Sequence, residues 1–178
     1  LRREIEMIIV GSFEELQDQK ISAFYKDGAL HLSFASIDSQ SLFDDVVHEI
    51  AHSVEEVYGY SIYADQNIKK EFLRKRKYLH DLLWAKGFKA PWAFFANPEY
   101  DEEFDMFLYE TVGYEKLSPI MEGLFVSPYA ATSLKEYFAT GFVEFYLDSN
   151  HNFLKKLGPQ LYKKLEMLQN EKKLDNAG

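Results

Sequence analysis

The pentad His48-Glu49-Ile50-Ala51-His52 is the strongest indication of fold and chemistry in this chain. If these residues are helical, one turn carries His48 round to His52, so both imidazoles project from one face. Two neutral imidazoles placed in this way can bind one Zn²⁺ through nitrogens about 2.0–2.1 Å from the metal. Glu49 lies beside that face, where it can accept a proton from a zinc-bound water as general base. The pattern is typical of zinc peptidases, in which it is written HExxH.

The residues around this pentad favour one amphipathic helix. A capping box over Ser41–Asp44 predicts the start of the helix, and Gly59 predicts its end. Between them, apolar side chains recur at helical spacing: Val46, Val47, Ile50, Ala51, Val54 and Val57. The alternative is an ordinary amphipathic helix that carries two incidental histidines.

Strands are expected before this helix. The residues Ile5–Val10 read as a strand, and a short polar helix is expected at Phe13–Gln17. Asp27-Gly28 lies between Ile21–Tyr25 and Leu30–Phe34, which predicts a hairpin. This order resembles small zinc peptidases, in which an antiparallel edge strand lies over the motif helix and pairs with extended substrate.

The fold class is therefore α+β and zincin-like, with a small N-terminal antiparallel sheet and a mostly helical C-terminal half. The 178 residues are expected to form a single metallopeptidase domain. Residues 1–58 hold the strands and the HExxH helix, and residues 60–125 form a helical, aromatic insertion. Residues 127–168 hold a third-ligand helix and a C-terminal helix, and residues 170–178 form a flexible tail.

Composition excludes several classes of function. The formal charge of −9 argues against a nucleic-acid partner, because phosphate binding needs a basic surface. The absence of cysteine excludes thiolate ligands, so a metal must be bound by histidine and carboxylate. No apolar run is long enough to span a membrane, so no membrane partner is expected, and no signal peptide is visible. The sequence does not indicate an oligomeric state.

Six basic residues gather in one stretch of this acidic chain. We interpret them as the solvated face of a helix, and an acidic partner or a nuclear address are the alternatives. The six are Lys69, Lys70, Arg74, Lys75, Arg76 and Lys77.

Two histidines leave a catalytic zinc site one protein ligand short. A third histidine six residues after the second is excluded, because Tyr58 stands there. Glu55 and Glu56 share the motif helix, and they suit either contacts to a metal-binding histidine or an exposed position on the surface better than metal binding itself. Glu136 begins an aromatic-rich helical segment and is the strongest candidate, although it could instead only close a capping box that starts at Ser133. The other candidates are His31, His80, Glu122, Glu144 and His151.

A resemblance favours Glu136. The segment Ser127–Ala139 looks like the second motif of the anthrax lethal factor catalytic domain and its smaller relatives, the secreted Pro-Pro endopeptidases. In that family a tyrosine stands seven residues before the glutamate ligand, and two aromatic residues and an alanine follow it. Tyr129 and Glu136 keep this offset, since 136 − 129 = 7. The resemblance covers most of the chain from Asp44 to about Leu168.

What this resemblance implies is a zinc metalloendopeptidase that is secreted and cleaves a peptide or protein substrate. One catalytic Zn²⁺ would be bound by His48, His52 and Glu136. Glu49 would act as general base, and Tyr129 would donate a hydrogen bond to the scissile carbonyl oxygen. A non-catalytic or structural zinc-binding interaction domain of the same fold is the alternative.

Two features depart from the family pattern. The second histidine and the glutamate are 136 − 52 = 84 residues apart, which is longer than in these relatives, and the aromatic segment Trp84–Tyr114 is the expected insertion. Thr140 stands where lethal factor carries an acid one turn after its ligand. If that acid supports a ligand histidine, another residue must do so here.

Overall fold

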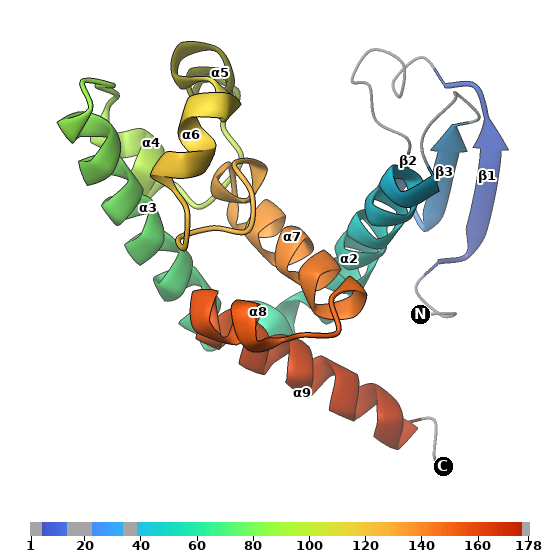
Figure 1. The fold of residues 1–178 in the computed structure, drawn as a ribbon. Coiled ribbons are helices and arrows are strands. Elements are labelled where there is room, and N and C mark those ends of the chain that lie inside the picture. The colour runs from blue at the N-terminus through green and yellow to red at the C-terminus, as the bar shows by residue number, and fades with distance from the viewer. Residues whose placement is uncertain (1–4, 14–22, 34–38, 176–178) are drawn as a thin grey trace. The chain divides into compact units, whose positions relative to one another are not determined.

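The computed structural model describes residues 5–13, 23–33 and 39–175, and it has the predicted α+β class. Its contacts divide the chain into two compact units, Leu1–Ser61 and Ile62–Gly178. A small three-stranded sheet lies in the first unit, and helices make up most of the rest (Figure 1). None of the helices in the described ranges is both long and apolar enough to cross a membrane.

The predicted hairpin is present in the first unit. Strand β2 (Ala23–Lys26) pairs antiparallel with β3 (Ala29–Ser33). Asp27 and Gly28 connect them with φ angles of 50° and 79°. A two-residue hairpin turn needs positive φ at both central residues to match the twist of the strands. Aspartate and glycine adopt this left-handed conformation with little strain.

The sheet is mixed, so the prediction of an antiparallel sheet is wrong for one strand pair. Strand β1 (Met7–Gly11) runs parallel to β3, and the strand order is β1-β3-β2. The hairpin reverses the chain between β2 and β3, and β1 occupies the other edge of β3 in the same direction as β3. The helix expected at Phe13–Gln17 falls largely on residues outside the described ranges.

The HExxH stretch lies within helix α2 (Ser39–Tyr63). The helix continues for four residues after Gly59, so the predicted stop at this glycine is wrong. A glycine inside a helix costs only about 1 kcal/mol, and the extra turn carries Ile62, which is fully buried. The predicted cap by Ser41 concerns a side chain outside the described part of the structure.

The second unit is built from helices and short helical turns, which Figure 1 shows from green to red. These are α3 (Asn67–Ala85), α4 (Trp92–Ala96), α5 (Glu102–Met106), the π-helix η1 (Phe107–Val112), α6 (Tyr114–Ile120), the 3₁₀ turn η2 (Tyr129–Ala131), α7 (Leu134–Leu147), α8 (Asn152–Leu157) and α9 (Pro159–Asp175).

Helices α3, α7 and α9 form the centre of this unit. Gly141 of α7 lies so close to α9 that a Cβ there would collide with the side chain of Leu161. The carboxylate of Glu71 on α3 accepts hydrogen bonds from the Tyr137 hydroxyl and from the first backbone N–H groups of α9, including Gln160 N. An acidic group at a helix N-terminus satisfies N–H donors and interacts favourably with the helix dipole.

The interpretation of the basic cluster as a solvated face is wrong for two of its members. Lys75 is 6 % exposed and donates hydrogen bonds to the carbonyls of Leu124 and Leu157, at 2.6 and 2.7 Å. Arg76 is fully buried. Both cations lie on the same side of α3 as the buried apolar residues, so their charges are held by backbone carbonyls instead of water.

Candidate metal centre

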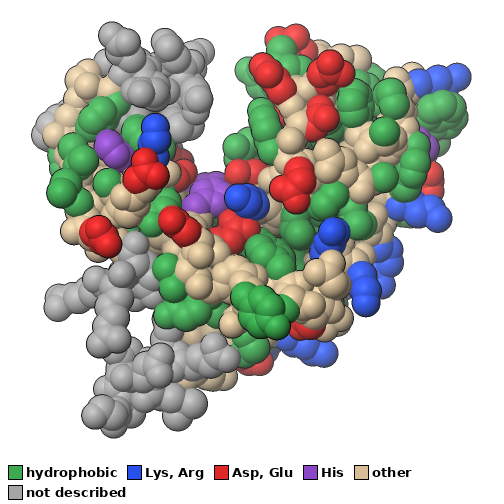
Figure 2. Space-filling model, turned by 180° about the vertical axis from the view of Figure 1, so that it is seen from behind, with side chains coloured by type: hydrophobic (Ala, Val, Ile, Leu, Met, Phe, Trp, Pro, Cys, Tyr) green, Lys and Arg blue, Asp and Glu red, His purple; other side chains and the backbone are tan. Residues whose placement is uncertain are grey.

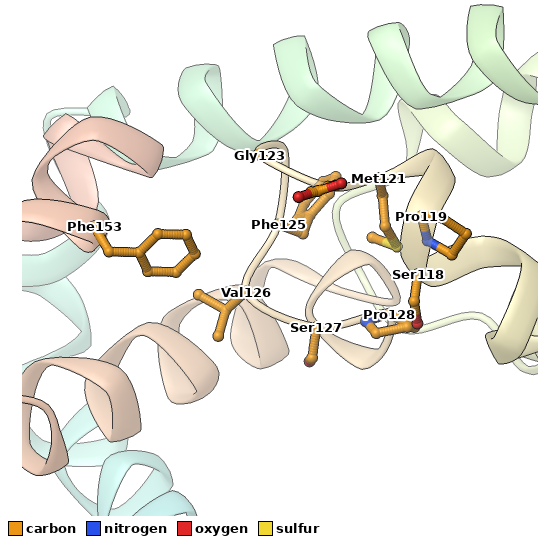
Figure 3. A pocket seen from close by; sticks show the side chains of 10 residues that line it. Ser118, Pro119, Met121, Gly123, Phe125, Val126, Ser127, Pro128 and Phe153 are labelled. Atoms are coloured by element: carbon orange, nitrogen blue, oxygen red, sulfur yellow. The ribbon is translucent and has the colours of Figure 1, made fainter.

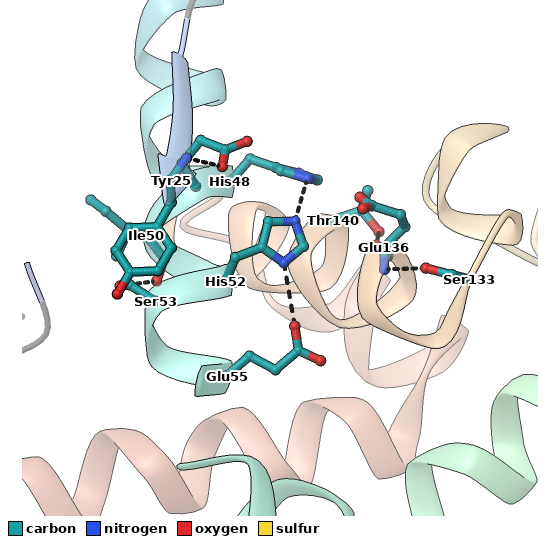
Figure 4. Close-up of polar contacts among 10 residues, drawn as sticks. Tyr25, His48, Ile50, His52, Ser53, Glu55, Ser133, Glu136 and Thr140 are labelled. Atoms are coloured by element: carbon teal, nitrogen blue, oxygen red, sulfur yellow. Dashed lines mark hydrogen bonds and ion pairs between the residues drawn. The ribbon is translucent and has the colours of Figure 1, made fainter. Parts of the chain in front are cut away.

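The two histidines of α2 face one another as the pentad predicts. His48 Nε2 and His52 Nε2 are 3.2 Å apart (Figure 4). Two nitrogens bound tetrahedrally to one zinc, each about 2.0–2.1 Å from it, would be about 3.3–3.4 Å apart. Glu49 belongs to the same cluster, since one donor atom from each of the three residues lies within 4.8 Å of the others. This geometry could hold a metal ion.

Glu55 contacts the opposite nitrogen of His52. Its Oε2 lies 3.3 Å from His52 Nδ1, and the residue is only 7 % exposed (Figure 4). A carboxylate at Nδ1 favours the tautomer that leaves Nε2 available as a ligand and holds the ring in position. Of the two roles predicted for Glu55, the contact with a histidine of the motif is the one that the structure shows.

Glu49 is held against the edge strand β2. Its Oε2 accepts a hydrogen bond from the backbone N–H of Tyr25, at 2.7 Å. Partial burial and then a hydrogen bond with Glu56 raise the pKa of the Tyr25 phenol. Both contacts join β2 to α2 within the first unit.

Tyr129 and Glu136 belong to the second unit. Tyr129 begins η2 and is 40 % exposed, and Glu136 lies in the first turn of α7. The side chain of Ser133 caps this helix, because its Oγ accepts a hydrogen bond from the backbone N–H of Glu136 at 3.1 Å. Capping therefore holds the Glu136 backbone at a defined place next to η2.

Partial burial raises the pKa of Tyr129 above its ordinary value of 10, and the negative charges of Glu136 and Asp105 raise it further. The phenol therefore keeps its proton, and with it the ability to donate a hydrogen bond, at neutral pH. The pKa of Tyr100 is raised to about 12 by burial, by its 2.9 Å hydrogen bond to Asp105 and by other nearby acids. Burial and the charge of Asp105 raise the pKa of Tyr114 in the same way.

Sequence reasoning missed these neighbours of Tyr129. Tyr100, Asp105 and Tyr114 come from the aromatic insertion, and no local pattern separates them from its other polar residues. The backbone hydrogen bond from Leu134 N to Pro98 O, at 2.7 Å, joins this insertion to the start of α7. Contacts between segments this far apart in the chain follow only from tertiary packing.

Arg76 anchors the turn that carries Tyr129. Its guanidinium donates to the carbonyls of Ala131 at 2.7 Å and Thr132 at 3.1 Å, and also to that of Phe94. The guanidinium lies 4.1 Å from the ring centroid of Phe104. Burial lowers the pKa of Arg76 to about 9, so the side chain stays charged at neutral pH.

A sequence signal for this buried role was available. Positions 68, 72, 76, 79 and 83 recur at helical spacing, and the other four are Ile68, Phe72, Leu79 and Leu83. An arginine on an apolar stripe is expected to lie inside, where it must find acceptors.

The other candidate ligands have different surroundings. The ring of His31 stacks on Phe24 with centroids 4.3 Å apart, and His151 stacks on Phe145 at 4.6 Å. Burial and the nearby Asp148 raise the pKa of Glu144. Within the described ranges, the histidine and acidic side chains that gather as a possible metal site are His48, Glu49 and His52.

A pocket of about 410 Å³ is lined mostly by residues that come shortly before Tyr129 in the sequence. Its lining includes Met121, Glu122, Phe125 and Pro128 of the segment before η2, and Phe153 of α8 (Figure 3). Glu122 is thus part of a mostly apolar pocket wall in the second unit.

The site residues therefore fall into two groups. The described structure brings together His48, Glu49, His52 and the supporting Glu55 in the first unit, and Tyr129 and Glu136 are neighbours in the second. The joining of Glu136 to the two histidines stays a prediction. No family model matches the chain, and neither the curated proteins nor the solved structures contain a significant match.

Proposed function

We propose that this protein is a zinc-dependent endopeptidase of the type represented by the lethal factor catalytic domain. The observation that carries the proposal is the 3.2 Å separation of His48 Nε2 and His52 Nε2, with Glu49 in the same cluster. The carboxylate of Glu55 behind His52 adds the support that a ligand imidazole needs. The offset of seven residues between Tyr129 and Glu136 supplies the second motif.

In this proposal His48, His52 and Glu136 bind one Zn²⁺. A neutral nitrogen pair and one carboxylate are a donor set that zinc prefers in peptidases. Bound zinc supplies a Lewis acid that makes water a nucleophile near neutral pH. The cluster geometry in α2 fits this role for the two imidazoles.

The chain's own groups carry the proton transfers. Glu49 accepts a proton from the attacking water and later delivers it to the leaving amine. Its hydrogen bond from Tyr25 N keeps the carboxylate oriented beside the two imidazoles. Tyr129 donates a hydrogen bond to the carbonyl oxygen as negative charge develops there, and its raised pKa keeps this proton in place.

The primary test combines metal analysis with cleavage of a peptide library followed by mass spectrometry. The wild-type protein is expected to retain one zinc per chain after dialysis and to cleave peptides. Glu49→Gln is expected to retain zinc and to lose nearly all cleavage, and Glu56→Gln, which removes a charge on the same helix, is the matched control. A fully active Glu49→Gln protein would show that Glu49 is not the general base.

A second comparison tests the third ligand. Glu136→Ala is expected to lose zinc on dialysis, as His48→Ala would. Glu144→Ala removes another carboxylate from α7 and is expected to retain zinc. Stoichiometric zinc in the Glu136→Ala protein would assign the third position to another residue.

A structural zinc site is the second candidate, and one observation favours it. The 2.7 Å hydrogen bond from Tyr25 N engages one oxygen of Glu49, which would limit the access of that carboxylate to water. Replacement of zinc by cobalt separates the two proposals, because the cobalt spectrum reports coordination. A spectrum that changes on addition of acetohydroxamate supports an open catalytic position, and an unchanged spectrum with no cleavage supports a closed structural site.

A further inference from the structure

The exposed side of α3 differs from the rest of this acidic protein. Lys70, Arg74 and Lys77 are exposed and recur at intervals of four and three residues, so they lie on one face of the helix. Trp84 continues the same face one turn beyond Asp81, the acidic residue of this stripe. The basic side chains gather along the edge of the second unit where α3 lies (Figure 2).

Two indole rings extend this face. Trp84 is 50 % exposed and Trp92, at the start of α4, is 47 % exposed. Both lie against the ring of His80, with centroid distances of 5.5 and 5.3 Å. The ammonium group of Lys89 lies 5.3 Å from the Trp84 ring. The two indoles and Lys89 therefore lie together near the end of α3, and Lys70, Arg74 and Lys77 are exposed earlier on the same face of that helix.

The positions of the charges around His80 are also defined. Asp81 Oδ1 lies 3.0 Å from His80 Nδ1, so the acidic residue of the stripe is directed to this histidine. The remaining charged groups of the stripe are cations. Half-exposed tryptophans are unusual, because an indole usually loses most of its contact with water on folding.

We propose that this tryptophan–lysine surface, formed by Lys70, Arg74, Lys77, Trp84, Lys89 and Trp92, docks on a membrane that carries anionic lipid headgroups. Lysine and arginine are attracted to such a surface, and indoles favour the boundary between headgroups and acyl chains. The two features occur together here, and the combination matches a headgroup layer, in which cations contact lipid phosphates and indoles lie at the boundary with the acyl chains. The sequence predicted no membrane partner because no apolar run is long enough to span a bilayer. Surface docking requires no spanning segment, so this proposal replaces that prediction.

The chain contains its own probe for this proposal. Its two tryptophans are both in the proposed surface, so all indole fluorescence reports from that surface. On addition of vesicles of phosphatidylcholine and phosphatidylglycerol, we expect the emission to shift to shorter wavelength and the protein to sediment with the vesicles. Vesicles of phosphatidylcholine alone are expected to give neither effect.

Matched charge reversals test the location. The triple variant Lys70→Glu/Arg74→Glu/Lys77→Glu is expected to lower the partition coefficient about a hundredfold or more. The control Lys116→Glu/Lys156→Glu/Lys163→Glu makes the same charge change at exposed positions of α6, α8 and α9 and is expected to lower it less than about tenfold, because salt screens distant charges. Circular dichroism of both proteins checks that they fold.

Three outcomes would overturn the proposal. These are the absence of a fluorescence shift with anionic vesicles, an equal loss of binding in the two triple variants, and binding to soluble polyglutamate without binding to vesicles. The last result would assign the surface to an acidic protein partner. None of these measurements depends on zinc or on peptide cleavage, so they are independent of the proposed peptidase function.

Discussion

Glu55 Oε2 lies 3.3 Å from Nδ1 of His52, one helical turn earlier on α2, while Nε2 of the same ring faces His48. Nδ1 of this imidazole therefore contacts a carboxylate, while Nε2 faces the other histidine. Lethal factor carries an acid at the position of Thr140, which could support a ligand histidine. Here the Thr140 hydroxyl donates to the backbone carbonyl of Glu136 at 2.7 Å instead. Support for a ligand histidine can come from the motif helix itself.

This contact predicts a loss of zinc affinity in Glu55→Gln. Replacement of the carboxylate by an amide weakens the hold on the His52 ring and its tautomer, so the affinity for zinc is expected to fall by about 10- to 100-fold. Competition with a chromogenic chelator measures it. Glu56→Gln, whose carboxylate contacts Tyr25 instead, is expected to keep wild-type affinity. Equal affinities in the two variants would contradict a supporting role for Glu55.

Tyr129→Phe is expected to lower turnover by about 10²-fold or more, because one hydrogen bond that strengthens in the transition state is lost. Zinc content is expected to stay unchanged. Tyr109→Phe is the control, because Tyr109 is 60 % exposed in the same unit and has no assigned role. The raised pKa of Tyr129 predicts that this phenol causes no loss of wild-type activity below pH 10. An unchanged rate in the Tyr129→Phe protein would remove this residue from the mechanism.

Arg76→Met is expected to lower the free energy of unfolding by more than about 3 kcal/mol. The substitution leaves buried carbonyls, including those of Ala131 and Thr132, without their charged donor. Arg74→Met, at an exposed position two residues earlier on the same helix, is expected to change it by no more than about 0.5 kcal/mol. Urea unfolding followed by circular dichroism measures both, and similar values would contradict the anchoring role of Arg76.

The lowered pKa of Lys75 predicts that the free energy of unfolding rises with pH between about 8 and 10.5. Burial lowers its pKa from 10.5 to about 8, so between these values the unfolded chain binds more protons than the folded chain. The free energy of unfolding contributed by this group is expected to increase by about 1.5 kcal/mol from pH 8 to pH 9.5. Lys75→Met lacks the titrating group. The difference in the free energy of unfolding between the wild-type and Lys75→Met proteins should therefore change by this amount from pH 8 to pH 9.5. A pH-independent difference would show that Lys75 titrates normally.

Local pattern was enough to predict several elements. The 3.6-residue repeat around His48 predicted helix α2, and Asp27-Gly28 predicted the hairpin of β2 and β3. The same repeat predicted that two imidazoles four residues apart would meet, which they do. Each of these features depends on residues that are close in sequence, so backbone geometry and side-chain spacing determine it.

Where local pattern failed, a contact between distant segments decided the outcome. Helix α2 continues past Gly59, and β1 pairs parallel with β3 although adjacent strands were expected to alternate in direction. Lys75 and Arg76 can lie inside the second unit because backbone carbonyls far along the chain accept hydrogen bonds from them.

The chain's own sequence thus determined which side chains could bind a metal: a histidine pair on one helical turn with a glutamate between them. Tertiary structure decided what surrounds those side chains. The backbone of Tyr25 reaches Glu49 across 24 residues, and Asp105 lies near Tyr129 across a similar separation. Hydrogen bonds and charges act through space, so their partners depend on how the chain folds back on itself and not on the spacing of residues along it.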